Sequence, residues 1–472
     1  MRNTRYPLLL AAALVLLAVS LPAQAQTAGE SVRRMGRKFK DAITDTYYDA
    51  VAAIKGESAS PRRGTGTAYS AVYYVSMAEG SNRGDGTREV PFKNIQKALD
   101  VAPEGALILV AEGNYFGTLR SGNITVERPV TIQGGYNSLF SERDILRYCT
   151  TVRPDAASNE TQSGKGTLQV KVRRPGTNVT VDGLLFDRGF SIAYAAEDEG
   201  RPEGVASGRM QPPGTPGVGG EKLDGECKTA QTAIIFLDNC QSEVVIRNCA
   251  FVNAPDCAIR GSAGSVVTIE NCVFAAVRKA AVEITGANLA RNADIRFTRN
   301  TVLFAWPSDP EEGELGFAFR FMNGANGYLD HNILGCCSQA ALDRCRVETI
   351  REKETQKVTS AEYNIFFCNP LGDIALPGGD RPILVRAADF DDVEQLTGVT
   401  GNRDWDDASL FDGAVDPAYL DGFLHGGTMF MNRYPFERAL DLFGAVEDYG
   451  AQAVRYEQVE QATRRDRKRQ NQ

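Results

Sequence analysis

Residues 244–261 read VVIRNCAFVNAPDCAIRG, and residues 266–284 repeat the phrase as VVTIENCVFAAVRKAAVEI. In both, a β-prone run leads to an asparagine, a cysteine follows, and a phenylalanine lies three places after the asparagine: Asn248 with Phe251, and Asn271 with Phe274. The interval between the two asparagines falls in the range of about 20 to 50 residues that is typical of repeat architectures. The shared register therefore indicates stacked repeat units rather than chance similarity.

The asparagine returns further along the chain, each time after a β-prone run and before an apolar pair. Its positions are Asn248, Asn271, Asn300, Asn332 and Asn364, and Gly183 takes the equivalent place in VDGLLF. A coil of parallel strands must turn sharply beside a buried core without leaving backbone polar groups unpaired. Asparagine tolerates the left-handed conformation, and its amide can bond an equivalent residue one strand spacing, about 4.8 Å, away. These residues therefore predict a corner of a parallel β-solenoid, whose winding should be right-handed because parallel crossovers are.

The N-terminal part has its own pattern. A β-prone run at residues 72–75 leads into a Gly-rich loop, Pro91 opens a short helix, and Leu107–Val110 forms a second strand. The series YYVS, GDGT, PFKNIQKAL and LILVAEGNY is similar to the N-terminal module of secreted right-handed parallel β-helix proteins of the pectin-lyase-like group, which are often known only as a domain of unknown function. PVTIQGGYNSLFSERD, residues 129–144, resembles the first full coil of that group. The resemblance implies a fold and leaves the activity open.

The expected fold class is all-β: a single-stranded right-handed parallel β-helix with a short N-terminal capping helix. The predicted parts are a signal peptide at residues 1–25, a helical and linker segment at 26–66, the β-helix at 67–395 with a long Gly/Pro-rich loop at 197–228, a C-terminal closing region at 396–455 and a basic tail at 456–472. Within the closing region, LDLFGAVEDYGAQ, residues 440–452, resembles the closing strand of secreted repeat proteins of this kind.

The first residues indicate export. Arg2 and Arg5 precede an apolar run from Leu8 to Leu21, a pattern typical of a cleavable secretory signal that is too short to span a membrane. We therefore expect a protein that is secreted, periplasmic or held at the cell surface, without a transmembrane segment. The net charge of −8 gives no overall attraction for nucleic acid. An extracellular polysaccharide or an envelope component is the expected partner, and a monomer is the expected state.

A second column of residues follows the corner. Short strands are predicted at residues 258–260, 281–283, 318–320 and 341–343, and they end on Arg260, Glu283, Arg320 and Asp343. Because side chains alternate along a strand, the middle residue of each triplet should face the core and its neighbours should face outward. Four successive rungs are thus predicted to present Arg, Glu, Arg and Asp in one line.

This charged column has two interpretations. Opposite charges one rung apart can form a salt-bridge ladder with a structural role, and this interpretation is favoured. In the alternative, which the pectin-lyase-like resemblance implies, the strands belong to the sheet that bears the active groove. Arg260 or Arg320 would then be the base of a lyase, or Glu283 and Asp343 the two carboxylates of a hydrolase.

Other chemical signals are weak. The chain contains neither the Gly-His-Gly motif of polygalacturonases nor the Asp-Pro-His of alginate epimerases. His331 is expected as an exposed turn side chain, and no zinc site is expected because Cys and His do not cluster. No cofactor or metal is expected, although Asp404, Asp406 and Asp407 could weakly hold Ca²⁺.

The cysteines also follow the repeat. Cys249 and Cys272 each come one residue after the asparagine, and Cys336 and Cys368 each come four residues after it. The first pair should point inward as buried thiols, because rungs are slightly too far apart for an easy bridge. For the second pair a disulfide remains open.

Two classes of function remain. The leading interpretation is an exported, non-catalytic β-helix of the cell surface or envelope that acts as a scaffold or binds glycan. The alternative is a carbohydrate-active enzyme, a polysaccharide lyase before a glycoside hydrolase, because this fold hosts both kinds of protein.

Overall fold

The computed structural model describes residues 69–117, 123–154, 166–188, 233–287, 292–306, 315–345, 359–379, 381–393, 396–425, 434–454 and 457–458. The chain divides into two compact units, Met1–Ala68 and Tyr69–Gln472, and every described residue belongs to the second. The expected signal peptide at 1–25, the segment at 26–66, the loop at 197–228 and nearly all of the tail at 456–472 lie outside the described residues.

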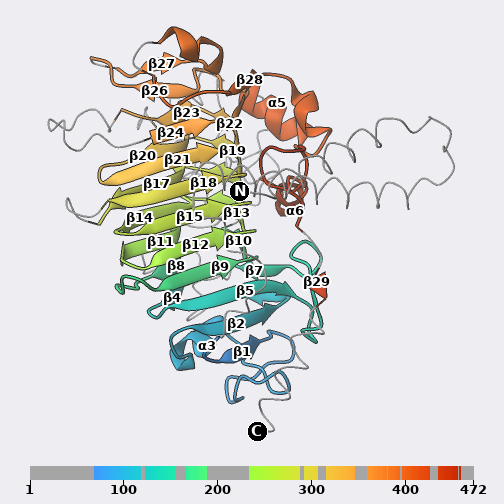
Figure 1. The fold of residues 1–472 in the computed structure, drawn as a ribbon. Helices are drawn as coiled ribbons and strands as arrows, with labels where there is room; N and C mark the ends of the chain where they lie inside the picture. The colour runs from blue at the N-terminus through green and yellow to red at the C-terminus, as the bar shows by residue number, and fades with distance from the viewer. Residues whose placement is uncertain are drawn as a thin grey trace, which may run out of the picture. The chain divides into compact units, whose positions relative to one another are not determined.

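The strands of the described part form three long parallel sheets (Figure 1). Sheet 1 contains β1 (Val72–Val75), β2 (Ala106–Ala111), β5 (Val130–Tyr136), β9 (Asn178–Asp182), β12 (Glu243–Arg247), β15 (Val266–Glu270), β18 (Ala293–Thr298), β21 (Ala325–Asp330) and β24 (Thr359–Glu362), and β6 (Glu142–Arg143) and β29 (Glu457–Gln458) extend it. Sheet 2 contains β3 (Gly113–Tyr115), β7 (Thr150–Val152), β10 (Leu185–Asp187), β13 (Ala250–Ala254), β16 (Val273–Val277), β19 (Thr301–Ala305), β22 (Ile333–Cys337), β25 (Ile365–Phe367) and β28 (Arg403–Trp405). Sheet 3 contains β4 (Ile124–Val126), β8 (Gly166–Val170), β11 (Ala233–Cys240), β14 (Ile259–Ala263), β17 (Ala280–Gly286), β20 (Phe317–Phe321), β23 (Ala340–Asp343), β26 (Ile374–Leu376) and β27 (Ile383–Val385).

Each rung takes one strand from each sheet in turn, so the expected right-handed parallel β-helix is confirmed as the fold. The core between the sheets is built from columns of like residues on successive rungs. Phe186, Phe251 and Phe274 are direct partners across β10, β13 and β16, and their rings stack with centroids 5.3 and 4.8 Å apart. All three are fully buried, so the recurring phenylalanine of the sequence marks one side of the core.

The corner between sheets 1 and 2 differs from the expected one in register. Asn248 and Asn271 have the left-handed backbone that was predicted, as does Gly183. In the later rungs the left-handed residues are Arg299, His331 and Tyr363, and the asparagine comes one residue later. The prediction that Asn300, Asn332 and Asn364 share the left-handed position is therefore wrong. Pairing of Glu270 with Thr298 aligns Asn271 with Arg299, so the repeat is one residue shorter here than the asparagines suggest.

The residue after the left-handed position forms a second, buried ladder. The side-chain amides of Asn300, Asn332 and Asn364 donate to the carbonyl oxygens of Ile269, Phe297 and Leu329, each on the preceding rung, at 2.9, 2.8 and 3.2 Å. Their Oδ1 atoms accept backbone N–H groups of that same rung, from Cys272, Asn300 and Asn332. Asn402, which the sequence analysis missed, continues the ladder by accepting the N–H of Asn364 at 2.8 Å.

Cysteine fills this buried position in two earlier rungs. The Cys249 thiol lies 3.7 Å from the carbonyl oxygen of Val181, and the Cys272 thiol lies 3.7 Å from that of Ile246. These carbonyls are the register partners of those that accept from the asparagines. A thiol is a weaker donor than an amide, and its one S–H also faces a nearer carbonyl of its own rung, that of Arg247 at 3.1 Å or of Glu270 at 3.2 Å.

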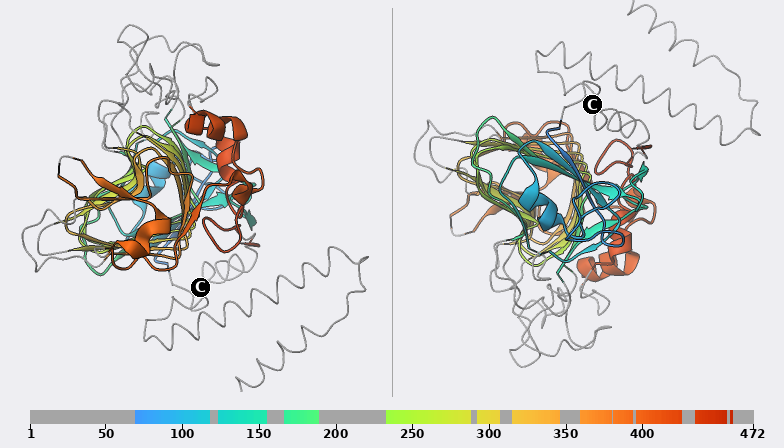
Figure 2. Two further views of the ribbon diagram at one scale, coloured as in Figure 1. Left: turned by 90° about the horizontal axis from the view of Figure 1, so that it is seen from above. Right: turned by 90° about the horizontal axis from the view of Figure 1, so that it is seen from below.

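The N-terminal end of the coil is covered as the sequence predicts. Helix α3 (Ile95–Val101) buries Ile95, Ala98 and Leu99 and contacts β1, β2 and β4 (Figure 2, right). The free edge of β1 is paired by the loop that precedes the helix: Tyr74 accepts the N–H of Phe92, and Phe92 accepts the N–H of Ser76. This loop thereby covers the outer edge of β1.

Residues 440–452 form no strand, so the prediction that they are the closing strand is wrong. Residues 387–392 and 408–411 form the 3₁₀ helices η5 (Ala387–Asp392) and η6 (Ala408–Phe411), followed by α5 (Pro417–His425) and α6 (Phe436–Leu440). Residues 441–450 are turns and bends. Helices α5 and α6 lie along the outside of sheet 2 (Figure 2). The reason is the apolar outer face of that sheet, where Phe304 packs its ring against Tyr419, Phe423 and Tyr434.

Side chains of the coil hold the C-terminal region in place. Asn253 imitates a strand partner: its Oδ1 accepts the N–H of Tyr434 at 2.8 Å, and its amide donates to the carbonyl of Tyr434 at 3.2 Å. Asn271 accepts the N–H of Gln452 at 2.6 Å. Within the described residues, no helix is long and apolar enough to cross a membrane.

We predict that Asn332→Ala destabilises the protein by about 2–5 kcal/mol, because a buried N–H of Asn300 and a buried carbonyl of Phe297 each lose a partner. Urea unfolding monitored by circular dichroism measures the change. Asn326→Ala is the matched control, since Asn326 bonds Asp294 on the half-buried outer face of sheet 1, and it should cost less than about 1 kcal/mol. Equal losses of unfolding free energy in the two variants would show that the buried asparagine ladder contributes no more to stability than an outer-face hydrogen bond.

Candidate functional site

Sheet 3 brings the predicted charged column together. Arg260 is the register partner of Glu283, Glu283 of Arg320, and Arg320 of Asp343, on β14, β17, β20 and β23. The residues before them, Ile259, Val282, Phe319 and Leu342, face the core as expected. The four alanines that precede these were expected outside, but they also join the core.

The column is a continuous chain of ion pairs. Arg260 Nε lies 3.4 Å from Glu283 Oε1, Arg320 Nη1 lies 2.7 Å from Glu283 Oε2, and Arg320 Nε lies 2.8 Å from Asp343 Oδ2. Each charge therefore has an opposite charge on the neighbouring rung. The order of the sequence, Arg, Glu, Arg, Asp, becomes a ladder of alternating sign.

Two residues that the sequence analysis missed complete the ladder. Asp256 Oδ2 lies 2.8 Å from Arg260 Nη1, and Lys279 Nζ lies 3.2 Å from Glu283 Oε2. Both residues precede their partners by four positions, at the bend that leads into sheet 3. The signal was present as opposite charges in DCAIR and KAAVE, but a four-residue spacing is usually associated with a helix rather than with a β-helix corner.

The middle of the ladder is buried. The side chains of Glu283, Arg320 and Asp343 are 8%, 6% and 4% exposed, whereas that of Arg260 is 39% exposed. The guanidinium of Arg320 also lies over the ring of Phe317, 5.3 Å from its centroid. Only the Arg260 end of the predicted groove is accessible to a ligand of any size.

The electrostatics oppose the catalytic roles that were considered. Burial would raise the pKa of Glu283, but Lys279, Arg320 and Arg260 together hold it below its ordinary value. Burial would lower the pKa of Arg320, yet Asp343 and Glu283 raise it, and Asp256 does the same for Arg260. A general acid needs a raised carboxyl pKa and a lyase base needs a lowered arginine pKa, so both shifts have the unsuitable sign.

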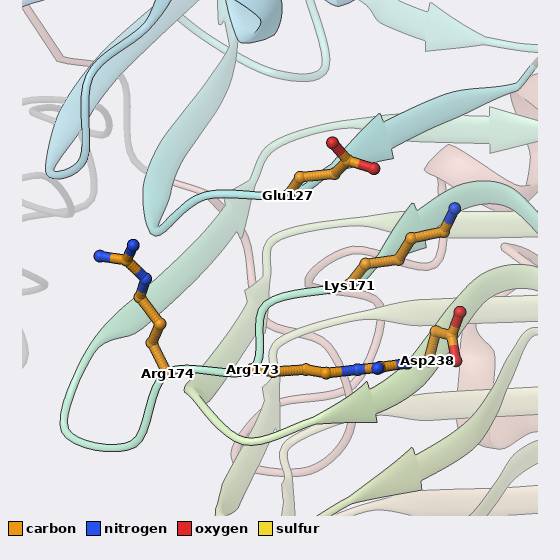
Figure 3. A pocket seen from close by; sticks show the side chains of 5 residues that line it. All are labelled: Glu127, Lys171, Arg173, Arg174 and Asp238. Carbon is orange, nitrogen blue, oxygen red and sulfur yellow. Dashed lines mark ion pairs between the residues drawn. The ribbon is translucent and has the colours of Figure 1, made fainter.

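The accessible part of the outer face of sheet 3 lies on the earlier rungs. Thr125, Gln169 and Phe236 continue the charged column toward the N-terminus by direct register. Beside them is an open depression of 540 Å³, which we call the rung pocket (Figure 3). It is lined by Glu127, Lys171, Arg173, Arg174 and Asp238.

The charges of the rung pocket are only partly engaged. Arg173 extends toward Asp238, with 3.6 Å between Nη2 and Oδ1 (Figure 3). Gln169 also donates to Asp238, at 3.2 Å. Arg174 points away from the others and pairs with Glu104. Lys171 has no ion-pair partner within the described part of the chain. Its ammonium group is therefore available to a ligand.

The remaining candidate residues occupy structural positions. His331 is half-buried rather than an exposed turn side chain: it holds the left-handed corner, lies 2.7 Å from Asp330 and stacks its ring on Tyr363. Asp407 accepts the N–H of Ser409 and so caps η6. Among the described residues no three His, Cys, Asp or Glu side chains come together in a way that could hold a metal ion, and this includes Asp404, Asp406 and Asp407.

Comparison with known proteins adds to the fold. A family model described as a protein of unknown function, DUF1565, matches residues 78–147, the N-terminal module singled out above. Two structures of GH136 lacto-N-biosidase from Eubacterium ramulus are similar at 11% identity. One has a TM-score of 0.36 and the match covers 71% of this chain and 55% of that one, so the chain spans little more than half of its length. The other has a TM-score of 0.27, with 71% and 68% covered.

A rhamnogalacturonan lyase is similar at 10% identity and a TM-score of 0.19, with 65% of this chain and 72% of that one covered. A search of curated protein sequences gives no significant match. At these identities and scores, the similarities to solved structures carry no argument about chemistry.

We predict that Glu283→Gln lowers the free energy of unfolding by about 3–5 kcal/mol at neutral pH, because Arg320 and Lys279 then lose their shared carboxylate in a buried site. Glu270→Gln, on the outer face of sheet 1, should change it by less than about 1 kcal/mol.

The pH dependence of stability gives a second readout. The folded pKa of Glu283 is lowered, so its contribution is present above the ordinary glutamate pKa of about 4.3 and is lost as the pH falls through the folded value. Acid unfolding of Glu283→Gln should therefore be less steep in this range than that of the unchanged protein. Parallel acid-unfolding curves would contradict the assignment.

Proposed function

We propose that this chain is an exported, non-catalytic β-helix protein of the cell surface or envelope, and that it binds glycan on the outer face of sheet 3. The observation that carries the proposal is the neutralised ladder: Glu283 contacts three cations and Arg320 contacts two carboxylates. Groups engaged in this way stabilise the sheet and are poor proton donors or acceptors.

The binding surface would lie on the earlier rungs of the sheet. The rung pocket supplies the ammonium of Lys171 and the guanidinium of Arg173 for acidic groups or hydroxyl oxygens of a glycan, and the carboxylate of Glu127 for its hydroxyl protons. Gln169 and the half-buried ring of Phe236 lie beside it on the same face. These polar groups lie on neighbouring rungs, and the depression is open. Such a surface suits an extended glycan chain better than a compact ligand.

Export supports the same interpretation. The N-terminal pattern of two arginines, an apolar run and small residues is that of a secretory signal, and a rigid coil with its apolar outer face covered suits an extracellular role. We take the protein to act as a monomer without a cofactor.

The alternative is a carbohydrate-active enzyme, a lyase before a hydrolase, acting over Arg260, Glu283, Arg320 and Asp343. What favours it is the arrangement of these four residues in one column on one sheet face. It would require the buried pairs to open when substrate binds.

We predict that the purified mature chain binds members of a panel of acidic and neutral polysaccharides without cleaving them. Affinity gel electrophoresis measures binding, and ultraviolet absorbance of unsaturated products and new reducing ends measure cleavage. The double variant Lys171→Ala, Arg173→Ala should bind about tenfold more weakly, which corresponds to about 1.4 kcal/mol. Arg296→Ala, an exposed change on sheet 1, is the matched control and should leave binding unchanged.

Two results would contradict the proposal. If the double variant and the control bind polysaccharide equally well, the rung pocket is not the binding site. Cleavage of any polysaccharide that is lost in Arg260→Ala or Arg320→Ala, with circular dichroism spectra like those of the unchanged protein, would establish the enzyme instead.

A further inference from the structure

The thiols of the described residues fall into two groups. All nine described cysteines are free, and seven of them are buried. Most donate a hydrogen bond: Cys249 to the carbonyl of Arg247 at 3.1 Å and Cys272 to that of Glu270 at 3.2 Å, for example. The thiols of Cys336 and Cys368 differ, because neither has a hydrogen-bond acceptor among the described residues.

Cys336 and Cys368 occupy equivalent places on neighbouring rungs of sheet 2. Gly335 is the register partner of Phe367, so the next residues, Cys336 and Cys368, continue the same alignment. Both have a left-handed backbone, with φ of 52° and 49°. Equal backbone angles on adjacent strands make their Cα–Cβ bonds nearly parallel, so both sulfurs leave the sheet on the same side.

The spacing of the pair allows a covalent bond once the two strands draw slightly closer at this point. Adjacent strands lie about 4.8 Å apart, which is inside the range of about 4.4–6.8 Å between the Cα atoms of a disulfide. The Cβ atoms need to approach by about 1 Å to reach the mean separation of about 3.8 Å in a disulfide. Both side chains project outward into the apolar cluster beneath the C-terminal region, and not into the close-packed interior of the coil.

Cys249 and Cys272 show why spacing alone is not sufficient. They too are aligned on adjacent rungs, but their thiols point into the main core and satisfy backbone carbonyls at the corner. Oxidation would leave those carbonyls without donors in a buried place. The Cys336 and Cys368 thiols satisfy no such group, so their oxidation removes no hydrogen bond.

We propose that Cys336 and Cys368 are a site of disulfide formation that staples the last two complete rungs of sheet 2. The two thiols lose two protons and two electrons as the S–S bond forms, and the electrons reduce the disulfide of an oxidoreductase or of glutathione to two thiols. The inference rests on the proposed export, because a disulfide persists in an oxidising compartment.

The timing of oxidation follows from the environment of the folded thiols. Burial, and then the neighbouring Cys368, raises the pKa of Cys336 well above its ordinary value. Burial, followed by Asp406, Asp404 and Asp407, raises the pKa of Cys368 to about 12. Thiolates are the reactive form, so the folded pair reacts slowly and the bond forms before the C-terminal region covers it.

The test uses the full chain, refolded with a fixed ratio of oxidised to reduced glutathione, so that its outcome does not depend on export. Acid quenching, alkylation and peptide mapping by mass spectrometry should find Cys336 linked to Cys368, with Cys249 and Cys272 alkylated. The thermal midpoint of the oxidised protein should fall by several degrees on reduction. The variant Cys336→Ala, Cys368→Ala should show no such fall, whereas Cys249→Ala should keep it.

Alkylation of both Cys336 and Cys368 after refolding, or linkage of either to another cysteine, would overturn the proposal. A thermal midpoint that is insensitive to reductant in the linked protein would refute its role as a staple. If the bond forms in glutathione but is absent from protein recovered from the producing cell, the disulfide site stands and the proposed export fails.

Discussion

The structure depends on one constraint: the chain must turn a tight corner between sheets 1 and 2 without leaving a buried peptide group unpaired. In every rung from β12 to β24, a left-handed residue makes the turn, and the residue after it sends a donor back to a carbonyl of the previous rung. Cysteine does this in two rungs and asparagine in the following ones. The geometry of the corner stays the same in these rungs. Replacing cysteine by asparagine at this position therefore changes only the strength of the donor, from a thiol to an amide.

The outer faces of the three sheets meet solvent in three different ways. Sheet 1 carries polar side chains such as Thr268 and Arg296 on its outer face. Thr268 is partly exposed and Arg296 is exposed, because only the inner face of this sheet is buried in the core. Sheet 2 is apolar outside and is covered by the C-terminal region, which contributes Tyr419, Phe423 and Tyr434. Sheet 3 buries charges and neutralises them along the column. The three outer faces can differ in this way because the core constrains only the inward-facing side chains of each strand.

The charged column on sheet 3 is a ladder of ion pairs. Catalytic carboxylates and bases need a partly unsatisfied charge in an accessible place. Here Glu283 and Arg320 are surrounded by opposite charges on adjacent rungs and are nearly inaccessible. The less engaged charges, with Lys171 as the clearest case, lie on earlier rungs, where the depression is open. The paired charges and the open depression thus occupy different parts of one sheet face.

The sequence by itself determined the fold class, the aligned phenylalanines, the capping helix and the order of charges in the column, because all of these follow from local periodicity. It did not determine the one-residue difference between Asn271 and Asn300, since both fit the same phrase and only strand pairing sets the register. It also could not show whether Glu283 would be free or paired. That depends on Arg320, which comes within reach only when separate rungs stack, and on the bend that brings Lys279 of the same rung to Glu283. The covering of sheet 2 by residues far along the chain was likewise decided by tertiary structure, because an apolar outer face in one part of a sequence does not name the segment that will bury it.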